Sequence, residues 1–251
     1  MTDSTDMIPL VDAALETRLS DPEAAVRSLE AVRQRARDLD RLDPHLDLLI
    51  DAAVAACLRN LGERARAAES AERVTSSIEP GTELARAQAA SVLGALALDR
   101  SELEAAQKHL TDGLRLLDEA AIAAPLLRAV LENLLGNVAL GSRDLRGARR
   151  HLLNAIEVSP ATSAMVTQIL STLGGVLGAL GDHEGALDAF SKVFTGHTNP
   201  RTAAWALHNQ AATLCAAGRH ADAEELNLEC LTLLERAKET PAAFDPQLPG
   251  L

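Results

Sequence analysis

Aromatic residues are nearly absent from this sequence of 251 residues. It contains no tyrosine, one tryptophan and three phenylalanines, so aromatic residues make up only 2% of the chain. Hydrophobic residues still reach 47%, and most of them are alanine and leucine, which are strong helix formers. Because the aromatic and β-branched residues that favour strands are scarce, the composition argues against a sheet-based fold and predicts an all-α protein.

Lysine is also rare, with Lys108, Lys192 and Lys238 as its three occurrences, and the formal net charge is −12. An acidic surface repels phosphate backbones, and no basic stripe with interleaved aromatic residues offsets that repulsion. The sequence therefore predicts no nucleic-acid binding by this segment. The charge is explained by solubility, with electrostatic steering of a basic partner as the alternative.

Cysteine is limited to Cys57, Cys215 and Cys230, none of which forms a CxxC pair or has a histidine at metal-binding spacing. This pattern excludes a disulfide framework and a zinc site. It is typical of reduced thiols in a cytoplasmic protein.

A signal peptide is lacking too, because the start, MTDSTDMIPL, has no basic segment followed by an apolar one. Residues 158–181 carry no formal charge and are long enough to span a bilayer. Pro160, Gln168 and several serines and threonines interrupt this stretch, however. A buried core helix explains it better, and we expect no membrane contact and a cytoplasmic location.

A repeat is what the sequence does contain. In GDHEGALDAF, Ala186 is followed four residues later by Phe190 and preceded twelve residues earlier by Gly174. The same frame recurs along the chain, with a small residue as anchor and 37 to 42 residues between successive anchors. The six anchors are Ala25, Ala67, Ala106, Ala148, Ala186 and Ala223, and the small residues twelve positions before them are Ala13, Ala55, Gly94, Gly136, Gly174 and Ala211.

Each copy holds two apolar helical stretches separated by a short polar break such as GDHEG. A capping side chain followed by proline, a helix start signal, occurs at Asp21-Pro22, Asp43-Pro44, Ser159-Pro160 and Asn199-Pro200. The small residues in the two stretches let their backbones approach closely. The sequence therefore predicts six helical hairpins.

The repeated residues resemble the tetratricopeptide repeat. Leu-Gly pairs in the first helix (Leu93-Gly94, Leu135-Gly136, Leu173-Gly174) and the Ala186–Phe190 spacing in the second carry this resemblance over roughly residues 7–238. The aromatic positions are mostly filled by leucine, alanine or histidine, and Asn227 replaces an apolar residue. The period also exceeds the family's usual length of about 34 residues. Longer versions are found in kinesin light chains and in bacterial signalling regulators of the MalT type.

The resemblance implies a right-handed α–α superhelix, a solenoid of about six hairpins spanning residues 1–238. Residues 239–251, which contain three prolines, are predicted to form a tail or linker. The first copy fits worst, with Asp12 and Glu16 in its first helix, as is common for terminal repeats.

Catalytic motifs are absent. GNVALGS at residues 136–142 lacks the lysine of a phosphate-binding loop and lies within a helical repeat. His183 and His220 occupy the turn inside their repeats, where a structural role is expected. We predict that the protein is not an enzyme and binds no cofactor and no metal.

The first helix of each hairpin is expected to line a concave groove. Counting from the small packing residues places mostly amides, with the only tryptophan, on that side in the last three copies. Amides both donate and accept hydrogen bonds and so suit a peptide backbone, and tryptophan offers amphipathic contact area. The predicted groove residues are Asn133, Asn137, Gln168, Ser171, Trp205, His208 and Asn209.

The sequence thus favours a non-catalytic scaffold that binds a protein or peptide segment. One alternative is a sensor or regulatory segment of a larger bacterial signalling protein, acting through ligand binding or dimerisation. A self-assembling structural protein is a third reading. Effector sequence beyond Leu251 would mark the regulatory segment, and an exposed apolar end repeat would mark self-assembly. In the last helix Leu228, Leu231, Leu233 and Leu234 exceed what one buried face needs, so a homodimer through the C-terminal hairpin is expected there.

Overall fold

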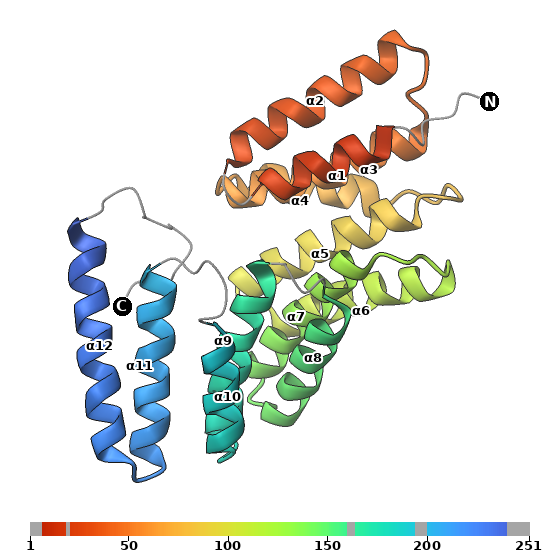
Figure 1. Ribbon diagram of the computed structural model, residues 1–251. Coiled ribbons are helices and arrows are strands. Elements are labelled where there is room, and N and C mark those ends of the chain that lie inside the picture. Colours follow the sequence, from red (N-terminus) through yellow and green to blue (C-terminus); the bar gives the residue numbers. More distant parts are fainter. Residues whose placement is uncertain (1–6, 19–20, 160–163, 194–199, 240–251) are drawn as a thin grey trace. The chain divides into compact units, whose positions relative to one another are not determined.

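The computed structural model describes residues 7–18, 21–159, 164–193 and 200–239, and these ranges contain helices and no strand (Figure 1). The twelve helices are α1 (Ile8–Thr17), α2 (Pro22–Asp38), α3 (Pro44–Asn60), α4 (Arg64–Thr75), α5 (Glu83–Asp99), α6 (Leu103–Glu119), α7 (Pro125–Gly141), α8 (Leu145–Val158), α9 (Ala164–Ala179), α10 (His183–Val193), α11 (Pro200–Ala216) and α12 (His220–Glu239).

The chain divides into two compact units, Met1–Ser142 with α1 to α7 and Arg143–Leu251 with α8 to α12. In the N-terminal unit each helix packs on the next, and α1, α3, α5 and α7 also contact one another in sequence. In the C-terminal unit α8 to α12 pack successively in the same way, and α9 contacts α11. This pattern is that of stacked helical hairpins, and it confirms the predicted all-α solenoid fold class.

The helices begin where the capping signals predicted. Pro22 and Pro44 are the first residues of α2 and α3, and the side chains of Asp21 and Asp43 each accept a hydrogen bond of 2.8 Å from a backbone N–H of the first turn. Pro200 likewise opens α11, whereas Pro160 lies outside the described residues. The last helix continues to Glu239, one residue into the predicted tail, and residues 240–251 are outside the described part.

All six anchor alanines are buried, and so are the small residues twelve positions before them in the second to sixth copies. The first copy is the exception, because Ala13 is exposed and Ala14 is buried in its place. The predicted alignment of α1 is therefore wrong by one residue. A cause lies in the sequence of α1, where Val11 and Ala14 face the core with the spacing of one helical turn and leave Ala13 to solvent.

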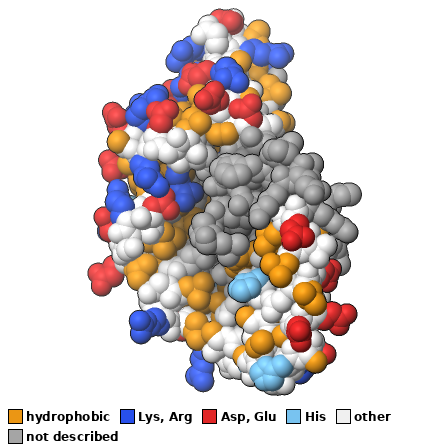
Figure 2. All heavy atoms as spheres, turned by 90° about the vertical axis from the view of Figure 1, so that its left-hand side faces the viewer, with side chains coloured by type: hydrophobic (Ala, Val, Ile, Leu, Met, Phe, Trp, Pro, Cys, Tyr) orange, Lys and Arg blue, Asp and Glu red, His pale blue; other side chains and the backbone are white. Residues whose placement is uncertain are grey.

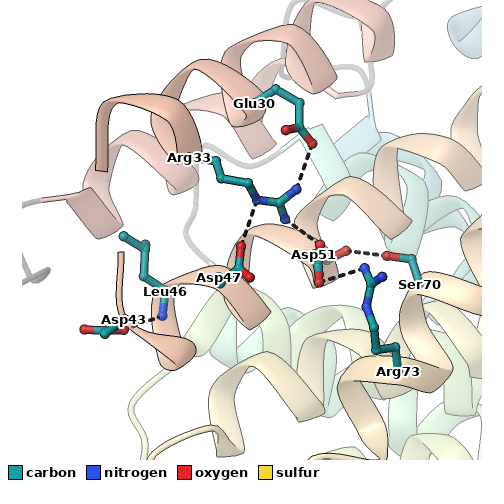
Figure 3. A network of polar contacts seen from close by, with 8 residues as sticks. All are labelled: Glu30, Arg33, Asp43, Leu46, Asp47, Asp51, Ser70 and Arg73. Carbon is teal, nitrogen blue, oxygen red and sulfur yellow. Dashed lines mark hydrogen bonds and ion pairs between the residues drawn. The ribbon is translucent and has the colours of Figure 1, made fainter. Parts of the chain in front are cut away.

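A charged network joins α2, α3 and α4 in the N-terminal unit (Figure 3). The guanidinium of Arg33 contacts Glu30, Asp47 and Asp51, and Asp51 also accepts an ion pair of 2.8 Å from Arg73. The Arg33 and Asp51 side chains are only 13% and 11% exposed. Burial by itself would lower the pKa of Arg33, but the three carboxylates outweigh it and raise that pKa above its ordinary value. Arg33 is therefore a permanent cation within this contact between hairpins.

Candidate functional site

The seven predicted groove residues are divided between the two units. Asn133 and Asn137 lie one turn apart on α7 of the N-terminal unit, and both are half-buried. The other five belong to α9 and α11, which contact each other in the C-terminal unit. A surface that combines all seven residues stays a prediction. The five residues of α9 and α11 can be compared within the C-terminal unit.

Ser171 on α9 is buried, with 6% of its surface exposed, and its hydroxyl finds no hydrogen-bond partner among the described residues. Ser91 holds the same place in its repeat, three residues before the small glycine, and is 8% exposed. Its hydroxyl donates to the carbonyl of Gln88 over 2.7 Å. In these two copies the serine is thus buried between helices, so Ser171 supplies little surface for a partner.

Trp205 on α11 packs against Phe190 of α10. The two ring centroids lie 6.4 Å apart with an interplanar angle of 75°, which is a favourable edge-to-face arrangement. The indole is half-buried rather than fully exposed. Trp205 therefore joins two helices of the C-terminal unit and keeps part of its surface for solvent, while Gln168 and His208 on α9 and α11 are exposed.

Asn209 is oriented by its own helix. Its side-chain nitrogen donates to the carbonyl of Trp205 over 2.8 Å, and the hydroxyl of Thr213 donates to the carbonyl of Asn209 over 2.8 Å. The side-chain oxygen of Asn209 makes no hydrogen bond with any described residue. One amide is thus held in a fixed rotamer with a single acceptor left for another molecule.

A hollow of about 220 Å³ lies beside Asn209, between α9, α10 and α11. We call it the α9–α11 hollow. A Cβ added at Gly175 would meet no atom within 4 Å, so this glycine leaves space open rather than allowing a close contact. The lining residues are Gly175, Gly178, His183, Phe190, Asn209, Ala212, Thr213 and Ala216.

The walls of the α9–α11 hollow combine apolar surface with a few polar atoms. The ring of Phe190 and the methyl groups of Ala212 and Ala216 are apolar, and Asn209 and His183 add polar atoms. The Nδ1 atom of His183 is buried and has no hydrogen-bond partner within the described residues. The lining includes no carboxylate, so this arrangement suits binding rather than acid–base chemistry with a paired acid.

Asn209 is the only lining residue that was predicted as a site residue; the other seven are Gly175, Gly178, His183, Phe190, Ala212, Thr213 and Ala216. The repeat pattern predicts a close approach of two helices at Gly174. A Cβ at Gly174 would lie 2.7 Å from two ring carbons of Phe190, whereas one at Gly175 would meet no atom within 4 Å. The repeat needs one small residue in this helix, and Gly174 supplies it. The two further glycines, Gly175 and Gly178, were the signal in the sequence that could have indicated open space.

The last helix presents unpaired apolar surface. Leu228 and Leu231 of α12 are 61% and 57% exposed, whereas Leu233 and Leu234 are partly buried against the cluster around Ala204, Leu207 and Cys230. Figure 2 looks from the side on which α12 lies in Figure 1, and it shows exposed apolar side chains between acidic ones.

Other kinds of site find no support in the described ranges. These ranges contain no group of three or more histidine, cysteine or acidic side chains arranged to hold a metal ion. No described helix combines the length and the apolar character needed to cross a membrane.

Comparison with known proteins supports the repeat assignment. Residues 166–236 match the model of the tetratricopeptide repeat family. Among solved structures, MamA is 18% identical, with a TM-score of 0.58 over 74% of this chain and 97% of that one. A putative kinesin light chain from Podosopora anserina with nearly identical TPR-like repeats is 15% identical, with a TM-score of 0.60 over 77% and 97%.

A Rap protein complexed with Competence and Sporulation Factor is 12% identical, with a TM-score of 0.64 over 94% of this chain and 67% of that one. At these identities the likeness establishes the fold. The sequence matches none of the curated proteins. The resemblance inferred from the repeat anchors is thus confirmed at the level of architecture.

Proposed function

We propose that this tetratricopeptide-repeat protein is a non-catalytic scaffold that binds a peptide segment of a partner protein. The observation that carries the proposal is the α9–α11 hollow, where apolar walls lie beside one oriented amide acceptor. The Rap protein of the same fold, solved with Competence and Sporulation Factor, supports a role in binding another molecule.

The size of the hollow favours a side chain of a peptide over a free small molecule. Its volume of about 220 Å³ lies below the roughly 300–1,000 Å³ that is usual for small-molecule sites. An apolar side chain fits against Phe190, Ala212 and Ala216, and a backbone N–H of the same peptide donates to the side-chain oxygen of Asn209.

Exposed groups on both sides extend the proposed site along the peptide. Gln168 and His208 supply polar contacts, and the open part of Trp205 supplies amphipathic surface. In the N-terminal unit, Asn133 and Asn137 form a second proposed contact of the same chemistry.

The test starts from peptides selected by phage display on the full chain, with affinities then measured by fluorescence anisotropy. Gly175→Leu fills the hollow and Asn209→Ala removes its acceptor. The matched controls are Ala179→Leu, on the exposed side of the same helix, and Asn227→Ala on α12. We expect each site variant to weaken binding about tenfold, equivalent to roughly one charge-neutral hydrogen bond or a few buried methylenes, with unchanged helical content.

Equal affinity for the site and control variants would show that the peptide binds elsewhere. A loss confined to Asn137→Ala would move the site to the N-terminal unit. A loss of helical content in Asn209→Ala would show that this amide is needed for folding, contrary to the proposal.

A regulatory segment that acts through dimerisation is the second candidate. The exposed leucines Leu228 and Leu231 favour it, because two such side chains on one helix are the kind of surface that another subunit covers. Within a larger bacterial signalling protein, a partner peptide or a second copy would then shift an equilibrium between assembly states.

Sedimentation equilibrium of the full chain tests this candidate. If the C-terminal hairpin forms the dimer interface, Leu228→Glu with Leu231→Glu converts a dimer to a monomer, and Leu153→Glu on α8 leaves the dimer intact. A wild-type monomer at high concentration rejects the candidate.

A further inference from the structure

The α8 arginine row consists of Arg146, Arg149 and Arg150, all of them exposed. Residues three and four apart lie on one face of a helix, so the three arginines share one face of α8, and together with Leu153 they line one shallow hollow. Leu153 continues this face one turn later and is 45% exposed. The row is thus a short basic strip that ends in an apolar side chain.

These arginines lack the partners that other arginines of the chain have. Arg150 contacts the Nε2 atom of its neighbour His151 at 3.3 Å, and the described residues provide no ion pair to any member of the row. Ten other arginines do form ion pairs: Arg27, Arg33, Arg59, Arg64, Arg66, Arg73, Arg100, Arg115, Arg128 and Arg219.

The surroundings explain why the row stays unpaired. Asp144, the nearest acid in sequence, uses its side chain to cap α8 by accepting a hydrogen bond of 2.9 Å from the Gly147 N–H. The helix that packs against α8 is α9, and its sequence, AMVTQILSTLGGVLGA, contains no charged residue. Glu157, the acid within α8 itself, lies seven residues beyond Arg150 and forms no ion pair with the row among the described residues.

We propose that the α8 arginine row binds an acidic segment of a partner protein. The chain as a whole has a formal net charge of −12, so an uncompensated basic strip is a local exception that attracts carboxylates. The planar guanidinium groups match carboxylates in a two-point geometry. The row lies on α8 and shares no residue with the lining of the α9–α11 hollow, so it is a site separate from the one proposed above.

The dimensions and composition of the row favour a peptide over a nucleic acid. From Arg146 to Leu153 the helix rises roughly 10 Å, at about 1.5 Å per residue, which is the reach of two or three neighbouring acidic side chains. Leu153 gives an apolar contact that a phosphate backbone does not use. The acidic remainder of the chain opposes the long polyanion of a duplex.

A fluorescent peptide of repeated Glu-Glu-Leu units is the probe, with a Gln-Gln-Leu peptide as the uncharged comparison. Arg149→Gln with Arg150→Gln removes two charges from the row. Arg35→Gln with Arg37→Gln removes the same charge from two exposed arginines of α2 and serves as the matched control. Both are measured on the full chain by anisotropy, together with thermal unfolding.

We expect the α8 double variant to weaken binding of the acidic peptide at least about tenfold, because two charge-assisted contacts are lost. The α2 double variant stays within about twofold of wild type, and added salt weakens the wild-type complex. Leu153→Ser weakens binding by about threefold, as loss of a partly buried apolar contact implies.

Two results would overturn the proposal. Equal binding by the two double variants would mean that the attraction is diffuse and that the row is no site. Tighter binding of a DNA duplex than of the acidic peptide, lost in the α8 variant, would assign the row to nucleic acid instead.

Discussion

The two units fill the space between their hairpins in different ways. In the N-terminal unit, where residues 1–142 contain no aromatic side chain, a charged network around Arg33 and Asp51 connects α2, α3 and α4. In the C-terminal unit, an edge-to-face pair of Phe190 and Trp205 connects α10 and α11, and Gly175 leaves a hollow beside it. In the N-terminal unit, ion pairs thus fill a contact between helical hairpins. In the C-terminal unit, the same kind of repeat leaves a hollow beside an aromatic pair.

The comparison has a thermodynamic side. A buried carboxylate with two arginine partners is stable only while all three groups are present, because each charge compensates the desolvation of the others. The packing of the Phe190–Trp205 pair depends on the shapes of the side chains around it. A larger side chain is tolerated there only at a position that faces the hollow, such as Gly175. The units therefore differ in which substitutions they tolerate.

The largest effect is expected for Asp51→Ala. The substitution leaves the buried Arg33 and the adjacent Arg73 without their shared carboxylate. We expect a loss of about 3 kcal/mol in the free energy of unfolding, as for other buried ion pairs with one partner removed. Urea unfolding followed by far-UV circular dichroism measures it.

The control for Asp51→Ala is Glu23→Ala, which removes the exposed Arg27–Glu23 pair from α2. Exposed pairs contribute little, so the unfolding midpoint of this variant should equal that of wild type. Equal losses in both variants would show that the network is no stronger than a surface pair.

A smaller effect, of opposite sign at two adjacent residues, is expected on α9. In Gly174→Ala the new methyl group meets the Phe190 ring at 2.7 Å, and we expect a loss of about 1–3 kcal/mol from overpacking. In Gly175→Ala the methyl group meets nothing, and the better helix propensity of alanine should add about 0.5–1 kcal/mol.

The only tryptophan of the chain, Trp205, makes this measurement specific to the C-terminal unit. Its fluorescence during urea unfolding should shift to lower urea in Gly174→Ala and to higher urea in Gly175→Ala. Shifts of the same sign would mean that Gly175 is also a packing residue, and the hollow would then not be open as described.

The fold was predictable from sequence because the same packing positions recur in every copy of the repeat. Ala25, Ala106 and Ala186 share one position and one environment, and the Asp-Pro pairs fix helix starts by local chemistry. The first copy was misaligned because a terminal repeat packs on one side only, so Ala13 and Ala14 cannot be ranked by pattern.

The candidate site was only partly predictable. Asn209 was found because an amide on the expected face of α11 is visible in the sequence. The burial of Ser171 was not predicted because burial at its position depends on the neighbouring helix. Gly175 was missed because a glycine can mark either a close contact or open space. The ion pairs between Arg33, Asp47 and Asp51 join residues of different hairpins, and repeat spacing does not encode such pairs.

The smallest expected effect concerns the three thiols, of which Cys57 in the N-terminal unit and Cys230 in the C-terminal unit are buried. Cys57 on α3 is buried, and burial raises the pKa of its thiol to about 11, although the nearby Arg18 opposes the shift. Burial also raises the pKa of Cys230, whose thiol donates to the carbonyl of Ala204. Cys215 on α11 is exposed. At pH 8, iodoacetamide should therefore modify Cys215 rapidly and the other two only after unfolding in urea.

The raised pKa of Cys57 also predicts a pH effect with a definite sign. The folded state favours the neutral thiol, so the corresponding stability is fully present below pH 9, the ordinary value, and is lost as the pH rises toward about 11. Cys57→Ala should remove this part of the alkaline decline, while Cys215→Ala should leave the decline unchanged. Mass spectrometry of the alkylated chain shows which of the three cysteines iodoacetamide modifies at pH 8. Rapid modification of Cys57 at pH 8 would show that the thiol on α3 is accessible in the folded N-terminal unit, contrary to its burial.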